Sequence, residues 1–225
     1  MSLRRHEEAP PCATGGSTRL PHLTQQSAVH QVSVSDKAVT FRRAVAIGHV
    51  VFSNPDPYRL ILEHSLKKGD VLAVARVAAI MAVKKTSDFI PLAHGGVAVE
   101  GCVADVEVVG PSRLSEDDES IRGSVGTSDA EAGSPHEITG SEQKMRGYLS
   151  APIGSFGGIR IGVSVSTTAK TGIEMEALTG VVGAGLTVID MCKAVDRHLK
   201  LEGVEVIGKS GGKSGAWGIY SKDNR

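Results

Sequence analysis

The residues best suited to chemistry are lysines and carboxylates, several of which lie beside glycines or at the ends of predicted elements. Asp190 and Lys193 are three residues apart in a predicted helix, so they are neighbours on its surface and can pair. Lys209 and Lys213 belong to the glycine-rich segment 208–215. Because lysine acts as a point charge towards phosphate, this segment is suited to an anionic partner. The pattern alone leaves open a second interpretation, in which all four residues are solvated surface charges.

The segment 208–214, Gly-Lys-Ser-Gly-Gly-Lys-Ser, is similar to a phosphate-binding P-loop but does not have its spacing. Three residues separate Gly208 from Gly212-Lys213-Ser214, whereas the motif requires four. The motif also needs a following helix whose N-terminus holds the phosphates, and only eleven residues follow Ser214. We therefore reject the P-loop assignment and expect a flexible glycine loop that carries two lysines.

The link 90–96, Ile-Pro-Leu-Ala-His-Gly-Gly, contributes one histidine, His94. A histidine alone in a loop is more often structural or solvated than a ligand. No H-x-x-x-H, H-x-H or Cys/His cluster accompanies it, so the sequence predicts no dedicated metal site.

Composition excludes several classes of protein. The 225 residues include 25 Lys and Arg and 25 Asp and Glu, so the formal net charge is zero, which argues against a nucleic-acid-binding protein. Four Phe, three Tyr and one Trp are too few for platforms on which bases stack. We therefore expect no nucleic-acid partner.

Cysteines and apolar runs bear on the compartment. Cys12, Cys102 and Cys192 lie 90 residues apart and form no C-x-x-C motif, which argues against a disulfide scaffold and a structural zinc site. The longest apolar run, 77–83, is far shorter than the roughly 20 residues that a membrane-spanning helix needs. We expect a soluble intracellular protein with no membrane partner, in the cytoplasm or the mitochondrial matrix.

The chain is long enough for one folded domain. Residues 1–31 mix Pro, Gly, Ser and charge without periodicity and predict a disordered lead-in, with an organelle-targeting signal as the alternative. The domain is expected at 32–217, with a C-terminal tail at 218–225. Within it, 110–157 is rich in Ser, Gly, Glu and Asp and predicts a disordered surface insertion rather than a folded subdomain.

Hydrophobic periodicity predicts the elements of this domain. Strands are expected at 32–35, 43–52, 97–109, 158–167 and 204–207, and helices at 58–66, 71–87 and 173–197. Apolar and polar residues alternate along 158–167, and Asp70 is expected to cap the helix that follows it. The two middle strands would form a hairpin, and the valines of 97–109 imply a register shift or bulge. The order of the main elements is typical of a split βαβ, or ferredoxin-like, α+β fold with an antiparallel sheet packed on helices.

The helix predicted at 71–87 is apolar on nearly every side, because Arg76 is the only charged residue from Val71 to Val83. Such a helix must be covered all round. A sheet can cover one face and another helix part of the rest, so we infer that a second copy covers the remainder and that the protein is a homo-oligomer. A monomer with a large exposed patch is the less favourable alternative.

The helix predicted at 173–197 shows two stripes at a period of 3.6 residues. An apolar stripe, expected to face the sheet, comprises Met175, Leu178, Val182, Leu186, Ile189 and Cys192. A polar stripe comprises Glu176, Thr179, Gly183, Thr187, Asp190 and Lys193. Because a glycine inside a helix costs about 1 kcal/mol relative to alanine, Gly180, Gly183 and Gly185 predict the close approach of another backbone or of a ligand.

Several ordered segments together resemble one family, the cyclic pyranopterin monophosphate synthases, or MoaC family, of molybdenum cofactor biosynthesis. The matching segments are 34–37, 42–46, 67–76, 84–87, 90–94, 170–179, 189–195 and 209–215. The most specific of them is Ile-Asp-Met-Cys-Lys-Ala-Val at 189–195. The family usually has Cys-His-Pro where this chain has Ala-His-Gly at 93–95, and it is alanine-rich where 179–186 is glycine-rich.

The resemblance implies a pyrophosphate-releasing lyase of ferredoxin-like fold, assembled as a hexamer with active sites at subunit boundaries. The substrate would be the cyclised dihydro-GTP, and the product cyclic pyranopterin monophosphate. Asp190 matches the family's catalytic aspartate, Lys193 the essential lysine beside it, and Lys68 a second essential lysine. Substrate-binding and pocket positions match Leu92, Ala93, His94, Glu174, Met175, Glu176, Lys209 and Lys213. No cofactor is expected, although magnesium could accompany the triphosphate.

These assignments make chemical sense. A triphosphate with about four negative charges needs several cations, and lysines close to one another can serve as acid or base because like charge lowers a lysine pKa. Our hypothesis is that Lys68 and Lys193 move protons while Asp190 orients Lys193. Two alternatives are a non-catalytic relative that binds a nucleotide or pterin phosphate, and a structural scaffold built around the apolar helix.

Overall fold

The structure is a computed structural model that describes residues 29–111 and 153–221. The fold concerns the compact unit Val34–Arg225. The lead-in predicted at 1–31 and the insertion predicted at 110–157 lie almost wholly outside the described residues.

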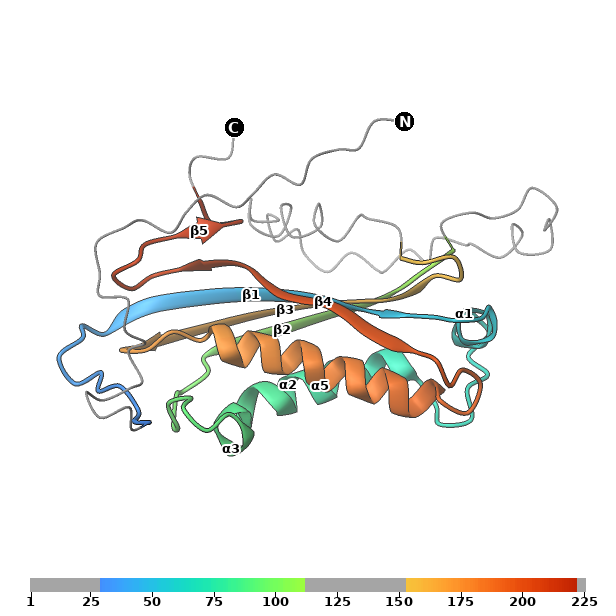
Figure 1. Ribbon diagram of the computed structural model, residues 1–225, viewed down its shortest axis with the longest axis horizontal. Coiled ribbons are helices and arrows are strands. Elements are labelled where there is room, and N and C mark those ends of the chain that lie inside the picture. Colours follow the sequence, from blue (N-terminus) through green and yellow to red (C-terminus); the bar gives the residue numbers. More distant parts are fainter. Residues whose placement is uncertain (1–28, 112–152, 222–225) are drawn as a thin grey trace, which may run out of the picture. The chain divides into compact units, whose positions relative to one another are not determined.

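The described part of the chain contains one antiparallel sheet with strand order β2-β3-β1-β4-β5 (Figure 1). Its strands are β1 (Thr40–Val51), β2 (Gly101–Val109), β3 (Gly158–Ala169), β4 (Lys200–Ser210) and β5 (Trp217–Gly218). The helices are α1 (Asp56–Leu62), α2 (Val71–Lys84), α3 (Thr86–Phe89) and α5 (Glu174–Cys192). This confirms the predicted α+β class and the predicted β2–β3 hairpin.

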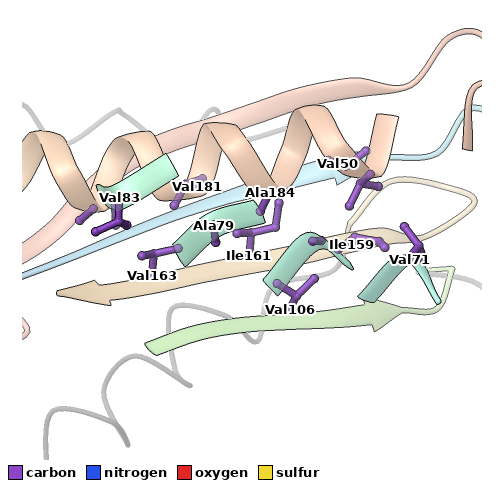
Figure 2. Packing of buried hydrophobic residues seen from close by; sticks show 14 of the residues in the cluster. Val50, Val71, Ala79, Val83, Val106, Ile159, Ile161, Val163, Val181 and Ala184 are labelled. Carbon is purple, nitrogen blue, oxygen red and sulfur yellow. The ribbon is translucent and has the colours of Figure 1, made fainter. Parts of the chain in front are cut away.

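The core lies between the sheet and the two long helices. Helices α2 and α5 pack on the same face of the sheet (Figure 1). The inward residues of β3, namely Ile159, Ile161 and Val163, are fully buried beneath α2 and α5 (Figure 2). The period-two alternation predicted for this strand is therefore confirmed.

Glycines let the two helices approach each other closely. A Cβ atom on Gly180 would lie 2.8 Å from a methyl carbon of Val83, and one on Gly183 would lie 2.5 Å from the Cβ of Ala82. Both contacts are with α2, while Gly185 lies against Leu201 of β4. The predicted close approach of another backbone is thus confirmed at Gly180 and Gly183, which lie near the Ala79 and Ala78 carbonyls of α2, whereas the atoms nearest to a Cβ on Gly185 belong to the Leu201 side chain.

The stripes predicted for α5 are wrong over most of its length, although Cys192 is buried and Asp190 and Lys193 are exposed as predicted. Met175 is 40% exposed and Leu186 is 58% exposed, although both belong to the stripe assigned to the sheet. The predicted polar stripe is partly inside, because Glu176 and Thr179 are buried. The face that packs on the sheet and α2 consists mainly of Ala177, Gly180, Val181, Ala184, Val188 and Cys192. Small residues were preferred there because the helices lie so close together.

Several element boundaries also differ from the prediction. Residues 32–35 form no strand, and β2 pairs with β3 in one unbroken register, without the predicted bulge. The register shifts lie instead between β1 and β4, where Gly203 adopts a φ of 62° in the left-handed region. The domain end predicted at 217 falls inside β5, and the next residues reach Ile219, which is buried.

By length and composition, α5 is the one helix in the described residues that could cross a membrane. However, 56% of its most apolar window is buried inside the fold. Its apolar composition therefore agrees with its position in the core between α2 and the sheet.

We expect Gly183→Val to lower the free energy of unfolding by about 1–3 kcal/mol, because the added carbons would overlap Ala82 and overpack the helix interface. Leu186→Val is the matched control, since it places the same β-branched residue on an exposed position of α5 and should cost no more than about 0.5 kcal/mol. Urea unfolding measures both. Equal midpoints for the two variants would contradict the close helix contact.

Candidate active site

Three predicted residues from two distant parts of the chain meet at one end of α5. The Nζ atom of Lys68 lies 2.6 Å from Oδ2 of Asp190, and that of Lys193 lies 2.7 Å from Oδ1. Lys68 also donates to the Asp190 backbone carbonyl at 2.9 Å. Each carboxylate oxygen thus receives one ammonium group. We call Lys68, Asp190 and Lys193 the lysine–aspartate cluster.

Local structure explains why Lys68 reaches α5. Gly69 has a φ of 90°, which reverses the chain just before α2. Asp70 then caps α2, as predicted, since its side chain accepts a hydrogen bond from the Ala73 amide at 3.0 Å. The turn leaves Lys68 outside the helix and directed at Asp190.

Lys193 lies at the end of α5 rather than within it, because the helix predicted to extend to 197 stops at Cys192. Lys193 is the C-cap residue, and its amide donates to the Ile189 carbonyl at 2.9 Å. The predicted pairing across three residues is retained, since the last turn keeps Asp190 and Lys193 on the same side.

The two lysines hold Asp190 in its ionised form. The hydrogen bond from Lys193, followed by that from Lys68, lowers the pKa of Asp190 from 3.8 to about 2. The side chains of the cluster are between 46% and 62% exposed, so a ligand can reach them from solvent. At neutral pH the cluster carries one carboxylate and two ammonium groups and can attract an anion.

Cys192 stands between Asp190 and Lys193 in the chain but does not share their exposure. It is fully buried, and burial, with a smaller effect from Asp196, raises the pKa of its thiol to about 11. A neutral buried thiol is not a nucleophile at pH 7.

A second ion pair lies at the other end of α5. The Nζ atom of Lys209 lies 2.5 Å from Oε1 of Glu174, and both side chains are partly buried. Lys209 belongs to β4 and pairs with Ala44 and Trp217 across the sheet, so the flexible loop predicted from residue 208 is wrong at this position. Because β4 extends to Ser210 and β5 begins at Trp217, the loop is confined to residues 211–216. Lys213 is exposed in that loop.

Glu176 lies in the first turn of α5. It is buried, although the sequence predicted it on the polar stripe of the helix. Burial chiefly, with the charge of Glu174 adding to it, raises the pKa of Glu176. Met175 is partly exposed. Leu92, Ala93 and His94 follow α3 and are partly buried, and α3 packs beside α5 (Figure 1).

The predicted site residues therefore form two groups at opposite ends of α5. Because a helix rises about 1.5 Å per residue, Glu174 and Asp190 lie roughly 24 Å apart along its axis. Figure 1 shows the same separation, with α3 and the start of α5 at one end of the sheet and α1 and the end of α5 at the other. One copy of the fold does not bring all the predicted residues to one place.

Sequence reasoning missed two groups that hold these ends in place. Arg42 donates to the carbonyls of Ala169 and Lys170 at 2.8 and 3.1 Å, just before Glu174. Asp196 receives hydrogen bonds from Ser53 beyond the lysine–aspartate cluster. Buried polar residues without a motif give little signal, although Asp196 two residues before His198 is a spacing that favours an Asx turn.

Among residues 29–111 and 153–221, no three His, Cys, Asp or Glu side chains are grouped so as to hold a metal ion.

Comparison with known proteins finds one matching family and several similar proteins. Residues 31–131 and 136–212 match the model of the MoaC family. The chain belongs to the MoaC family. The match includes every predicted site residue except Lys213, which lies one position beyond its end.

Individual relatives agree with the family match. The chain is 37% identical over 204 residues to a protein of Chloroflexus aggregans named cyclic pyranopterin monophosphate synthase, covering 91% of this chain and 96% of the relative. A protein of the same name from Methylobacterium sp. is 39% identical over 198 residues, 88% of this chain and 95% of the relative. Cyclic pyranopterin monophosphate synthase 3 of Mycobacterium bovis is 36% identical over 204 residues, 91% and 89% respectively.

We expect the lysine–aspartate cluster to stabilise the fold above pH 3.8 and to lose this effect as the pH falls through about 2, because the Asp190 pKa is depressed in the folded state. The carboxyl carbon of Asp190, followed by NMR, should titrate well below 3.8. Lys193→Ala should raise the midpoint of the Asp190 titration more than Lys68→Ala does, since Lys193 contributes most to lowering the Asp190 pKa. Lys200→Ala, which removes a lysine paired with Glu202, should leave it unchanged. An unaltered midpoint in both cluster variants would contradict the ion pairs.

Proposed function

We propose that this chain is a cyclic pyranopterin monophosphate synthase, a phosphorus–oxygen lyase that acts early in molybdenum cofactor biosynthesis. It converts 3',8-cyclo-7,8-dihydro-GTP to cyclic pyranopterin monophosphate and releases pyrophosphate. The observation that carries the proposal is the lysine–aspartate cluster, in a chain whose family relatives bear this name.

The cluster suits a reaction that must move protons while a cyclic phosphate closes. An oxygen of the substrate attacks the phosphorus next to the sugar, and the bond to the pyrophosphate oxygen breaks. Lys68 and Lys193 donate and accept protons at the rearranging ring system, and Asp190 holds both ammonium groups in place. General acid–base catalysis by positioned groups typically gives 10²–10⁴-fold acceleration.

The leaving group needs separate cations. A triphosphate with about four negative charges is matched by lysines, and Lys209 and Lys213 are the candidates in this chain. Lys209 is held by Glu174 before any ligand binds. Leu92, Ala93, His94, Met175 and Glu176 complete the proposed binding surface.

A second copy would unite the two groups of residues. The N-terminal end of α5 in one copy would meet the lysine–aspartate cluster of its neighbour, which a single copy separates by most of the helix length. Three large apolar residues of α2 support such an assembly, because Val74, Val77 and Met81 are exposed in the single chain. We propose that the assembly is a hexamer, built as a trimer of dimers. We also propose a ferredoxin-like fold for each subunit, which the strand order β2-β3-β1-β4 supports.

Other partners follow from the same proposal. The enzyme needs no cofactor of its own, and magnesium could arrive with the triphosphate. It acts in the cytoplasm or the mitochondrial matrix on a small molecule, without nucleic acid or membrane.

The purified protein should release pyrophosphate from the cyclised nucleotide, and Lys193→Ala should reduce turnover by about 10²–10⁴-fold through the loss of a proton-transfer group. Lys200→Ala is the matched control, because it removes an exposed lysine outside the cluster and should leave turnover unchanged. Coupled pyrophosphate detection and chromatography of the pterin product measure both. Turnover of Lys193→Ala within a factor of about ten of the parent would refute the assigned role. Tight substrate binding without pyrophosphate release by the parent would favour the non-catalytic binder.

Val77→Glu should dissociate the assembly, because it places a charge in the exposed apolar face of α2. Light scattering should then give the mass of a smaller species, and turnover should fall with it because the two groups of site residues no longer meet. Arg59→Glu, on exposed α1, is the control for adding a glutamate at the surface. A fully active monomer would contradict the shared site.

A further inference from the structure

A buried carboxylate, that of Asp196, lies three residues after Lys193, in the turn that follows α5. Asp196 is only 2% exposed. Its Oδ2 accepts a hydrogen bond from the Ser53 amide at 2.7 Å, and its Oδ1 accepts from the Ser53 hydroxyl at 2.5 Å and the His198 amide at 3.0 Å. The proposed reaction uses none of these groups.

These bonds join two segments that are 143 residues apart in the chain. Ser53 and Asn54 follow β1 and precede α1, and Asp196 follows Lys193 in the turn after α5. The Asn54 side chain adds a further hydrogen bond between the same two segments, because it donates to the Val195 carbonyl at 3.2 Å. We call Ser53, Asn54 and Asp196 the carboxylate clamp.

Both clamped segments lead to a lysine of the cluster. The turn after α5 is fixed to the helix end by the amides of Val195 and Asp196, which donate to the Cys192 carbonyl, and it begins at Lys193. The other segment starts α1, since the Asn54 side chain accepts from the Asp56 amide at 3.0 Å. The chain that leaves α1 then reaches Lys68.

Within residues 29–111 and 153–221, the donors to the Asp196 carboxylate are amides and a hydroxyl rather than lysine or arginine. Burial disfavours the charge, but the hydrogen bonds from Ser53, His198 and Asn54 outweigh it and lower the pKa of Asp196. A buried anion satisfied mainly by amides tolerates little displacement, because each lost bond leaves charge unsolvated. The clamp therefore restricts movement of the turn after α5 relative to the segment between β1 and α1.

We propose that Asp196 is a positioning residue, which fixes the turn that carries Lys193 against the segment that leads to Lys68 and thereby sets both ammonium groups on Asp190. The proposal extends the proposed function, because it assigns the geometry of the catalytic cluster to a residue that never touches the substrate. Misplacing a reacting group by about 1 Å can cost 100-fold in rate.

Asp196→Asn tests this with little change in shape. An amide keeps one acceptor oxygen, so its NH2 group must oppose either the Ser53 amide or the donors at Oδ1. We expect kcat to fall roughly 10- to 100-fold, with KM within about threefold of the parent. We also expect the NMR midpoint of Asp190 to rise by roughly 1 unit as the lysines move off it.

Two further variants keep the test decisive. Ser53→Ala removes one of the bonds and should give a smaller change in the same direction, which decides the matter if Asp196→Asn does not fold. Thr167→Val is the matched control. It removes one hydrogen bond, which the buried Thr167 hydroxyl donates to the Ala98 carbonyl at 2.6 Å near the C-terminal end of β3. It should lower stability without changing kcat or the Asp190 midpoint.

The outcomes separate the two proposals. If Asp196→Asn only loses stability, like Thr167→Val, and keeps the parent's kcat and Asp190 midpoint, the positioning role is refuted. If the parent shows no turnover at all, the proposed function fails, while the Asp190 titration still supports or overturns the clamp.

Discussion

Close packing between α2 and α5 determines which parts of the chain can meet. The glycines of α5 set Gly180 against Val83 and Gly183 against Ala82, so the two helices run antiparallel. The start of α2 then lies beside the end of α5, where Lys68 reaches Asp190. A different helix pairing would separate these groups, whatever their residue types. The cluster is thus a consequence of backbone proximity in the core.

The same packing explains the division of charge along α5. At its C-terminal end the charged groups are exposed and open to a ligand, whereas at its N-terminal end the Glu174–Lys209 pair is partly buried. A partly buried pair keeps its geometry without a ligand, and an exposed cluster can exchange partners. The proposed shared site would combine both behaviours, with the two ends of α5 contributed by different copies of the chain.

Local signals in the sequence predicted much of the fold. The alternation of β3, the Asp70 cap and the contact between Asp190 and Lys193 each depend on residues a few positions apart, and all three occur. Tertiary choices were not predictable in this way. The stripe of large residues on α5 predicted the wrong buried face. Leu186 is exposed, and smaller residues occupy the buried face because they allow close contact with α2. The only local sign of Asp196 is its Asx-turn spacing to His198, whereas Ser53, its other hydrogen-bond partner, is 143 residues away.

The ion pairs of an exposed cluster can orient its ammonium groups but cannot by themselves fix where its three residues lie. Solvent screens exposed ion pairs of this kind, so they contribute little to stability, and long lysine side chains lose conformational entropy when they are fixed. Order at Lys68, Asp190 and Lys193 must therefore be supplied by the backbone beneath them. The reversed turn at Gly69 restricts one lysine, and the helix end, tied by the buried carboxylate of Asp196, restricts the other. Buried hydrogen bonds stabilise the arrangement, and the exposed charges remain available to a substrate.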